Sequence, residues 1–189
     1  MESLKITSFD DLLRLKCLEP PSKSHRVGFG SDTHRFKEGE FIPLGGVNIP
    51  FDKSFVAHSD GDVLIHSLID ALLGAAGAGD IGEWFPDSDS RYKGVDSVSL
   101  LKRVKEFIIA VGFEIENIDV TLITEQPKIS PFKESIAENI CDILEIPRYR
   151  LNIKAKTAEK MGAIGRMEGM ATQCVATLRY FDWSKEACG

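Results

Sequence analysis

The stretch SDGDVLIHSLIDALLGAA, residues 59–76, decides the fold of this chain. Ser59 is a candidate helix N-cap and Asp62 follows three places later, which is an order typical of helix N-termini. From residue 63 to residue 76, apolar side chains recur at helical spacing. The pattern predicts a helix over residues 63–76.

Three ionisable side chains interrupt this otherwise hydrophobic helix. Asp62, His66 and Asp70 are spaced by four residues, so they lie along one stripe of the predicted helix. An unpaired charge is costly to bury, and each of the three therefore needs a partner. A helix cap explains Asp62 equally well, but it does not explain His66. We expect His66 to belong to a functional site.

The stretch GSDTHRF, residues 30–36, offers partners for His66. The run RVGFG before it, residues 26–30, is typical of a strand. If that strand continues, the side chains of Asp32 and His34 point to one face, about 7 Å apart. Taken alone, an Asp and a His at this spacing are more often a solvated surface pair than a metal site. With His66 they supply two nitrogens and one oxygen, which suits zinc with an open fourth position.

The rest of the chain carries further helix and strand patterns. Residues 41–50 are typical of a hairpin with Gly45-Gly46 at its turn. Residues rich in Gly, Asp and Pro indicate a long functional loop over 79–95. Periodicity predicts amphipathic helices over residues 96–111 and 131–144, and strands over residues 115–125, 151–157 and 170–181. This order predicts an α+β sandwich with helices against one face of a sheet.

The chain length of 189 residues favours one domain. We expect that domain to span residues 26–182, after an N-terminal extension of unassigned role over residues 1–25 and before a C-terminal tail over residues 183–189. The formal net charge is −6 and no basic block occurs, which argues against generic binding to nucleic acid or to a membrane surface.

The cysteines and the apolar runs bear on the cellular compartment. Four scattered cysteines form no C-x-x-C pair and favour a reducing compartment: Cys17, Cys141, Cys174 and Cys188. No apolar run is long enough to span a bilayer, and the acidic residues near the start disfavour a secretory or transit peptide. We expect a bacterial cytoplasmic location, with the plastid stroma as the alternative.

Several further residues have both a functional and a structural interpretation. His58 lies just before the predicted helix, where an anion is favoured, but it is equally consistent with an exposed loop histidine. The aspartates of residues 79–95 can hold a polyol or a second cation, or can simply form turns. In KAKTAEK, residues 154–160, the lysines favour a phosphate and Glu159 favours a divalent ion.

The chain resembles the 2-C-methyl-D-erythritol 2,4-cyclodiphosphate synthase family in five ordered motifs: GSDTHRF, LGGVNIPF, AHSDGDVLIHSLIDALLGAAGAGDIGEWFPDSD, DVTLITEQPKISP and NIKAKTAEKMGAIGRMEG. The resemblance covers about residues 26–180. It implies a ferredoxin-like α/β sandwich with a four-stranded sheet, helices on one face and a small hairpin. It also implies a homotrimer with active sites between subunits.

The resemblance further implies an activity in the methylerythritol phosphate route to isoprenoids. The substrate, 4-diphosphocytidyl-2-C-methyl-D-erythritol 2-phosphate, cyclises to 2-C-methyl-D-erythritol 2,4-cyclodiphosphate and releases CMP. The attacking group is a phosphate monoester, largely dianionic at neutral pH, so the site must neutralise charge more than it must remove a proton.

Individual residues match the functional positions of the family. Asp32, His34 and His66 match the zinc ligands, and Glu159 matches the ligand of a Mg²⁺ or Mn²⁺ ion. The pair that matches transition-state stabilisation consists of His58 and Thr157. The positions that match substrate-binding segments are Ser59, Asp80, Ile81, Gly82, Phe85, Pro86, Asp87, Ser88, Asp89, Thr124, Glu125, Gln126, Pro127, Lys128, Ile129, Ser130, Lys156, Ala158, Ala163 and Arg166.

A few positions depart from the family pattern. The family commonly has a histidine where Phe29 stands, an aromatic residue at Ser31, a threonine at Lys156 and a phenylalanine at Ala163. None of these changes removes a metal ligand. In the family, the positions of Ser31 and Ala163 help to line a cavity on the trimer axis that can hold isoprenoid phosphates. The small side chains here leave less apolar surface, so we expect such ligands to bind weakly or not at all.

Two other functions remain open at the level of the sequence. A zinc-dependent phosphatase or phosphodiesterase would use the same three ligands with water as nucleophile. A non-catalytic nucleotide-binding module would use the histidines structurally and would bind CDP without a metal.

Overall fold

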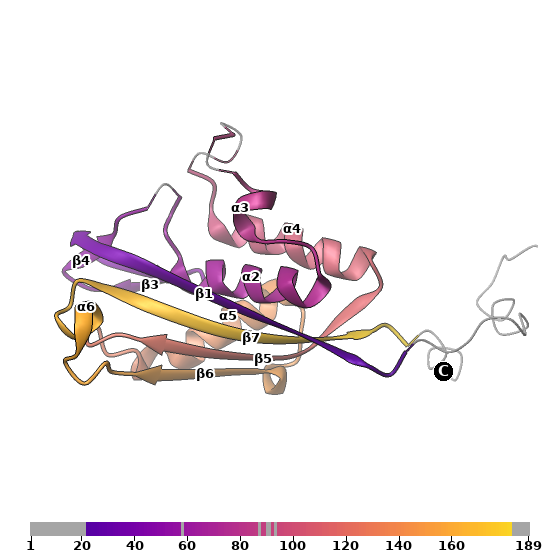
Figure 1. The fold of residues 1–189 in the computed structure, drawn as a ribbon. Coiled ribbons are helices and arrows are strands. Elements are labelled where there is room, and N and C mark those ends of the chain that lie inside the picture. The colour runs from indigo at the N-terminus through magenta and orange to yellow at the C-terminus, as the bar shows by residue number, and fades with distance from the viewer. Residues whose placement is uncertain (1–21, 58, 87, 90–91, 93, 183–189) are drawn as a thin grey trace, which may run out of the picture.

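The computed structural model describes residues 22–57, 59–86, 88–89, 92 and 94–182. Figure 1 shows the chain path. The elements in chain order are β1 (His25–Glu38), β2 (Phe41–Leu44), β3 (Val47–Pro50), β4 (Lys53–Phe55), α2 (Val63–Ala76), α3 (Ile81–Trp84), α4 (Ser97–Ala110), β5 (Phe113–Ile123), η2 (Ser130–Phe132), α5 (Lys133–Leu144), η3 (Arg148–Arg150), β6 (Leu151–Lys156), α6 (Gly162–Gly165) and β7 (Gly169–Tyr180).

The main sheet has the strand order β4-β1-β7-β5-β6. It therefore has five strands where four were predicted. The additional strand β4 is only three residues long and pairs with the end of β1, with Phe55 opposite Phe36. A strand this short gives no readable alternation, which is why the sequence did not reveal it.

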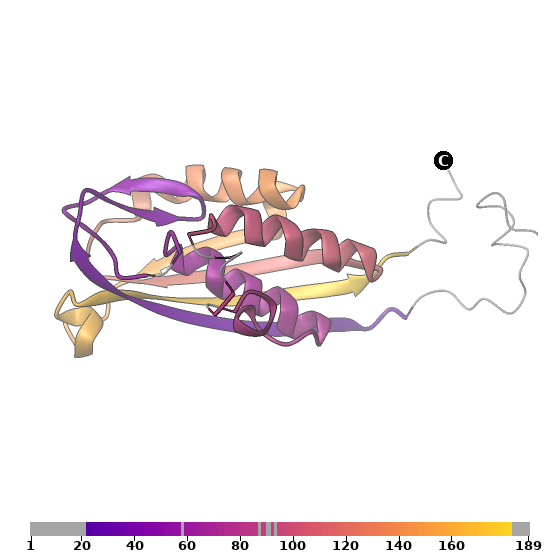
Figure 2. The same ribbon diagram turned by 90° about the horizontal axis from the view of Figure 1, so that it is seen from above.

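The α+β class is confirmed, with α2, α4 and α5 covering one face of the sheet (Figures 1 and 2). The prediction of a ferredoxin-like connectivity is wrong, because that motif runs β-α-β-β-α-β. Here α5 lies between β5 and β6, and these two strands pair in parallel. Parallel neighbours need such a crossover. The last two strands, β6 and β7, then follow without a long helix between them.

Helix α2 lies directly against β1, the strand that carries two of the predicted zinc ligands. A Cβ atom added at Gly28 would lie 2.0 Å from the Ala71 carbonyl oxygen, and one at Gly30 would lie 2.0 Å from the Ser67 carbonyl oxygen. Any side chain at either position would collide with the helix backbone. The two glycines therefore allow the backbones of α2 and β1 to touch.

The hairpin prediction is confirmed by β2 and β3, which pair in antiparallel register. Gly45 and Gly46 form its turn with φ angles of 61° and 76°, as a type I′ turn requires. Two short helices were not predicted. Helix α3 lies inside the expected loop 79–95, and α6 lies between β6 and β7.

The face of the sheet opposite the helices carries exposed apolar side chains. Val27 and Phe29 are 65% and 61% exposed, and Val175, which pairs with Phe29 across β1 and β7, is 36% exposed. A bilayer crossing would need a longer and more apolar helix than any in the described part of the chain.

Candidate metal centre

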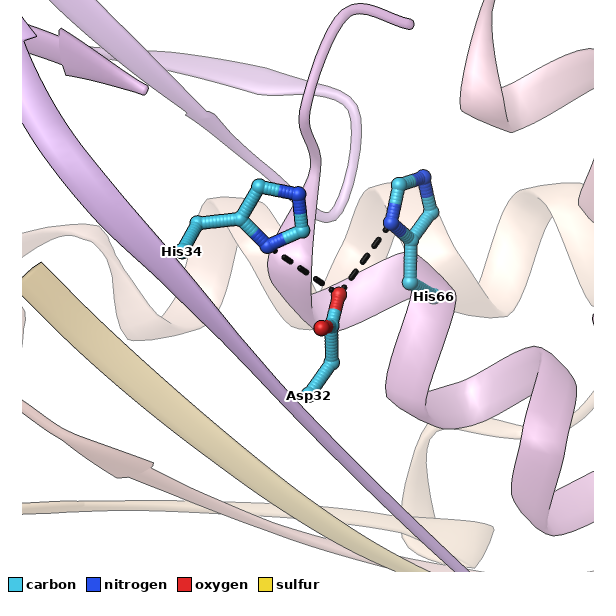
Figure 3. Close-up of side chains that lie close together, drawn as sticks. All are labelled: Asp32, His34 and His66. Carbon is cyan, nitrogen blue, oxygen red and sulfur yellow. Dashed lines mark hydrogen bonds and ion pairs between the residues drawn. The ribbon is translucent and has the colours of Figure 1, made fainter. Parts of the chain in front are cut away.

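The three predicted zinc ligands converge on one point. The Oδ2 atom of Asp32 lies 3.1 Å from the Nδ1 atom of His34 and 3.1 Å from the Nδ1 atom of His66. Figure 3 shows both rings turned toward this one carboxylate oxygen. One ligand atom from each of the three residues lies within 4.8 Å of the others, and no other group of this kind occurs among the described residues.

Backbone geometry brings the three residues together. Alternate side chains of a strand share a face, so Asp32 and His34 both point from β1 toward α2. His66 stands in the first turn of α2, and the close contact at Gly30 holds that turn against β1. The side chains of the three residues are only 13% to 25% exposed.

These residues fit a zinc ion. The Nδ1 atom of His34 is buried and has no hydrogen-bond partner of suitable geometry, although it lies close to the Asp32 carboxylate. A buried ring nitrogen without a partner is costly, and a metal ion would satisfy it. Two imidazole nitrogens and one carboxylate oxygen match the donors of a catalytic zinc site with an open position.

The charges of the centre reinforce each other. Burial raises the pKa of Asp32, but the close contacts with the His34 and His66 rings and their charge outweigh it and hold this pKa well below its ordinary value. Burial lowers the pKa of His66, but the Asp32 carboxylate outweighs it and raises this pKa. Asp32 is therefore anionic, and a proton competes with a metal ion for His66.

The Asp62 carboxylate caps α2 and binds the hairpin turn. Its Oδ1 atom accepts hydrogen bonds from the N–H groups of Leu64 and Ile65, which caps α2, and from Gly45. Its Oδ2 atom accepts from Gly46 at 2.7 Å. Of the two interpretations of this residue, the cap is confirmed, and the same carboxylate also fixes the hairpin turn to the helix.

Asp70 holds the loop that follows α2. Its Oδ1 atom accepts a hydrogen bond of 2.8 Å from the N–H group of Ile81, the first residue of α3. Asp80 caps α3 by accepting from the N–H group of Glu83 at 2.9 Å. The stripe of three ionisable residues on α2 thus has three separate tasks, and only His66 belongs to the metal centre.

A cavity of about 800 Å³ adjoins the three ligands. Its lining consists of Asp32, Thr33, His34, Arg35, Val56, Ala57, Ser59, His66, Asp70, Ile81, Gly82, Phe85, Tyr92 and Leu100. Four predicted substrate-binding residues are therefore part of the cavity wall, namely Ser59, Ile81, Gly82 and Phe85. The sequence did not single out Tyr92 or Leu100, because neither stands in a motif.

Other predicted residues of this region are placed differently. Asp80, Pro86, Ser88 and Asp89 do not line the cavity. His58 and Asp87 lie outside the described residues.

A second group of predicted residues lies where β5 and β6 end. The N–H group of Thr124 donates to the Lys156 carbonyl oxygen at 3.0 Å, which joins residues 124–130 to residues 156–159. Thr157 Oγ1 donates to Glu159 Oε1 at 2.5 Å. No residue of these two segments lines the cavity beside Asp32, and neither do Ala163 and Arg166.

Glu125 organises this second group. Its Oε1 atom accepts hydrogen bonds of 3.0 Å from the N–H groups of both Ala158 and Lys160. Between them, Glu159 adopts a left-handed backbone conformation with φ of 51°. One carboxylate thus binds the backbone on both sides of Glu159, the predicted ligand of a second cation.

The YgbB family model matches residues 25–179. The bifunctional enzyme IspD/IspF of Aliarcobacter butzleri is 54% identical over 183 residues, which are 97% of this chain and 49% of that protein. The solved bifunctional IspDF from Campylobacter jejuni is 46% identical with a TM-score of 0.89, over 95% of this chain and 48% of that one.

The chain spans about half the length of the curated relatives it matches. A solved 2C-methyl-D-erythritol-2,4-cyclodiphosphate synthase in its CDP-bound form is 34% identical with a TM-score of 0.75. That match covers 81% of this chain and 99% of the synthase. Since the family model matches most of the chain, and the fold agrees with solved relatives, the chain belongs to the YgbB family.

Proposed function

We propose that the chain converts 4-diphosphocytidyl-2-C-methyl-D-erythritol 2-phosphate to 2-C-methyl-D-erythritol 2,4-cyclodiphosphate and releases CMP. The observation that carries this proposal is the convergence of Asp32, His34 and His66 at the wall of a cavity of about 800 Å³. A relative named as this synthase supports it, because the match covers 99% of that relative's length.

Asp32, His34 and His66 would hold Zn²⁺, and Glu159 would hold Mg²⁺ or Mn²⁺. When bound, these ions supply Lewis acids that neutralise charge on phosphoryl oxygens. The protein's own task is to keep three donors rigid while one coordination position stays open. The buried Nδ1 atom of His34, which faces the Asp32 carboxylate without forming a hydrogen bond of suitable geometry, supports this assignment.

Other side chains would orient the substrate. Asp70 holds Ile81 and Gly82 at the cavity wall through its bond to the Ile81 N–H group, and the buried ring of Phe85 excludes water beside them. We assign one task to the Thr157 hydroxyl and to His58. Each donates a hydrogen bond to the charge that develops at phosphorus during the reaction. Each such donor contributes roughly 3–4 kcal/mol if it resembles an oxyanion-hole donor.

We further propose a homotrimer in which residues 124–130 and 156–159 of one subunit complete the cavity of its neighbour and bind the cytidine diphosphate part of the substrate. Two observations support this arrangement. These segments are absent from the wall of their own chain's cavity. The sheet face around Val27, Phe29 and Val175 is apolar and uncovered.

Incubation of the purified chain with the substrate tests the activity. Phosphorus NMR should show the cyclic diphosphate and equimolar CMP, and exhaustive chelation should abolish both. Release of inorganic phosphate in place of the cyclic product would favour a phosphatase. CDP binding that survives chelation, with no turnover, would favour a non-catalytic module.

A mixing experiment tests the shared sites. His66→Ala and Thr157→Ala should each be inactive alone, because each removes one half of the site. Co-refolded in equal amounts, they should recover about a quarter of wild-type activity, since about one interface in four then pairs two intact halves. No recovery in mixed trimers would show that both halves belong to one subunit.

A further inference from the structure

The ring of His66 is held at both of its nitrogens. Its Nδ1 atom faces the Oδ2 atom of Asp32, and its Nε2 atom lies 3.0 Å from the hydroxyl oxygen of Ser97. Ser97 is the first residue of α4 and is fully buried. The hydroxyl oxygen of Ser59 lies farther from the same nitrogen, at 3.4 Å.

Asp60 determines which hydrogen bond Ser97 can make. The Ser97 hydroxyl donates to the Oδ1 atom of Asp60, and the Ser97 N–H group donates to its Oδ2 atom at 3.0 Å. A carboxylate only accepts hydrogen bonds, and a hydroxyl has one proton to give. The proton of Ser97 is therefore committed to Asp60, so toward His66 the hydroxyl oxygen must accept.

This bond fixes the tautomer of His66. If Ser97 accepts from the ring, the proton of the neutral imidazole sits on Nε2. Without a metal, Nδ1 shares a proton with the Asp32 carboxylate. When that proton leaves, the lone pair of the ring lies on Nδ1 while Nε2 stays protonated. A histidine that binds a metal usually donates its other N–H group to an oxygen in this manner.

We propose that Ser97 and Asp60 are positioning residues for the metal centre: through hydrogen bonds they hold the His66 ring in the tautomer whose Nδ1 lone pair faces the zinc position. The inference rests on the proposed zinc site and adds the residues that prepare it.

Helix capping does not account for this arrangement. Helix α4 already has an N-cap in Asp96, whose side chain accepts from the Val98 N–H group at 3.2 Å. Ser97 and Asp60 are 37 residues apart in the sequence, so their contact ties the start of α4 to the loop before α2. Through the Ser97 hydroxyl, this contact reaches His66, the one ligand that α2 contributes.

Zinc affinity and ring ¹⁵N shifts test the proposal, and neither needs substrate. Zinc is titrated into the metal-free chain against a chromophoric chelator. Ser97→Ala should bind zinc about 10–100-fold more weakly, as is usual when a hydrogen-bond partner of a metal-binding histidine is lost. In the zinc-bound chain, the ¹⁵N signal of Nε2 in His66 should show the hydrogen bond to Ser97 in wild type and its loss in this variant. Ser97→Thr retains the hydroxyl and should restore both properties.

Two variants make the test specific. Asp60→Asn offers an amide N–H group to Ser97, which frees the Ser97 hydroxyl to donate to Nε2. This favours the tautomer with its proton on Nδ1, the atom that should bind zinc. Zinc affinity should therefore fall again. Ser67→Ala is the matched control. Ser67 is as buried as Ser97 and follows His66 directly, but its hydroxyl donates to the Leu64 carbonyl oxygen. This variant should bind zinc within twofold of wild type.

The outcomes separate this inference from the proposed function. If the wild-type chain binds no zinc, the proposed metal centre fails and the inference fails with it. If wild type binds zinc and Ser97→Ala and Asp60→Asn bind it equally well with unchanged ¹⁵N shifts, only the positioning role is overturned. A lower melting temperature with unchanged zinc affinity also overturns it, because the two residues would then serve only the fold.

Discussion

The two groups of candidate residues differ in how completely one chain builds them. At the metal centre, one chain places two ring nitrogens and one carboxylate oxygen together. These atoms come from β1 and α2, and the start of α4 holds the ring of the α2 ligand. At the ends of β5 and β6, Thr157 and Glu159 stand exposed on a segment held mainly by Glu125. The comparison shows that this chain brings the three candidate metal ligands together by itself, and it supports the proposal that a second surface completes the substrate site. Three substitutions test this difference, and a fourth, in neither group, serves as a reference.

The largest effect is expected from Gly30→Ala. A Cβ atom there would lie 2.0 Å from the Ser67 carbonyl oxygen and 2.7 Å from the Ala71 nitrogen, so α2 must move away from β1. We expect a loss of about 3 kcal/mol or more in the free energy of unfolding, measured in urea. Zinc binding should be lost with it, because His66 moves with the helix.

Gly74→Ala is the matched control for that substitution. Gly74 lies within α2, and a Cβ atom there would lie 3.8 Å from the Cα atom of Gly28, which is an ordinary van der Waals distance. This variant should be as stable as wild type or more stable by up to about 1 kcal/mol, because alanine favours a helix. Equal stability of Gly30→Ala and wild type would contradict the close backbone contact.

His66→Ala should separate metal binding from folding. Removal of one ligand should weaken zinc binding about 10²–10³-fold. This change corresponds to roughly a quarter of the binding free energy of 10–16 kcal/mol that four ligands supply in zinc-finger peptides. Chelator competition measures the change, and circular dichroism should show an intact fold. His25→Ala removes a histidine of β1 that pairs with Glu116 and should leave zinc binding unchanged. Global unfolding of His66→Ala would instead indicate a structural histidine.

Glu125→Ala should disturb only the second group. The variant loses the acceptor shared by the N–H groups of Ala158 and Lys160, so the segment carrying Glu159 becomes less ordered. We expect about a tenfold loss of kcat/KM, equivalent to a net hydrogen-bond contribution of about 1.4 kcal/mol, with zinc affinity unchanged. Glu138→Ala, on the exposed side of α5, serves as the control. A parallel loss of zinc would show that the two groups are coupled within one chain.

The smallest effect is expected from Asp119→Asn, on the sheet face away from the helices. Burial raises the pKa of Asp119, but hydrogen bonds from Lys154 and Asn152 outweigh it and lower this pKa below 3.8. An acid with a lowered pKa in the folded state stabilises the fold above its unfolded pKa, and this contribution disappears as the pH falls. The variant should lose less than about 1 kcal/mol at pH 7.

Urea unfolding at several pH values checks this expectation. The difference in unfolding free energy between Asp119→Asn and wild type should shrink as the pH falls below about 4. In that range the Asp119 carboxylate of the unfolded chain is protonated first, and that of the folded chain follows at lower pH. A difference that stays constant down to pH 3 would show that the ion pair with Lys154 does not contribute.

The sequence predicted those elements whose pattern is local and long. The helix over residues 63–76 matches α2 residue for residue, and the hairpin turn falls on Gly45 and Gly46 as expected. The convergence of Asp32, His34 and His66 followed from strand alternation and from the need to pair a charge on a buried helix. Zinc itself stays a prediction.

Features that depend on contacts between distant segments were not predictable. Asp62 could be a cap or a site residue until its bonds to the hairpin turn, 16 and 17 residues away, identified its task. No spacing rule relates Asp60 to Ser97. The parallel pairing of β5 and β6 depends on how α5 crosses the sheet, and the periodicity of three separate segments does not fix that crossing.

The glycine contact between α2 and β1 has a consequence for variation among relatives. A spacing set by side chains drifts when a leucine becomes a methionine, because rotamers adjust. Here the distance from His66 to its two fellow ligands is set by main-chain atoms that already touch. We therefore expect the ligand geometry to remain constant when the hydrophobic interior is repacked, provided that positions 28 and 30 carry no side chain.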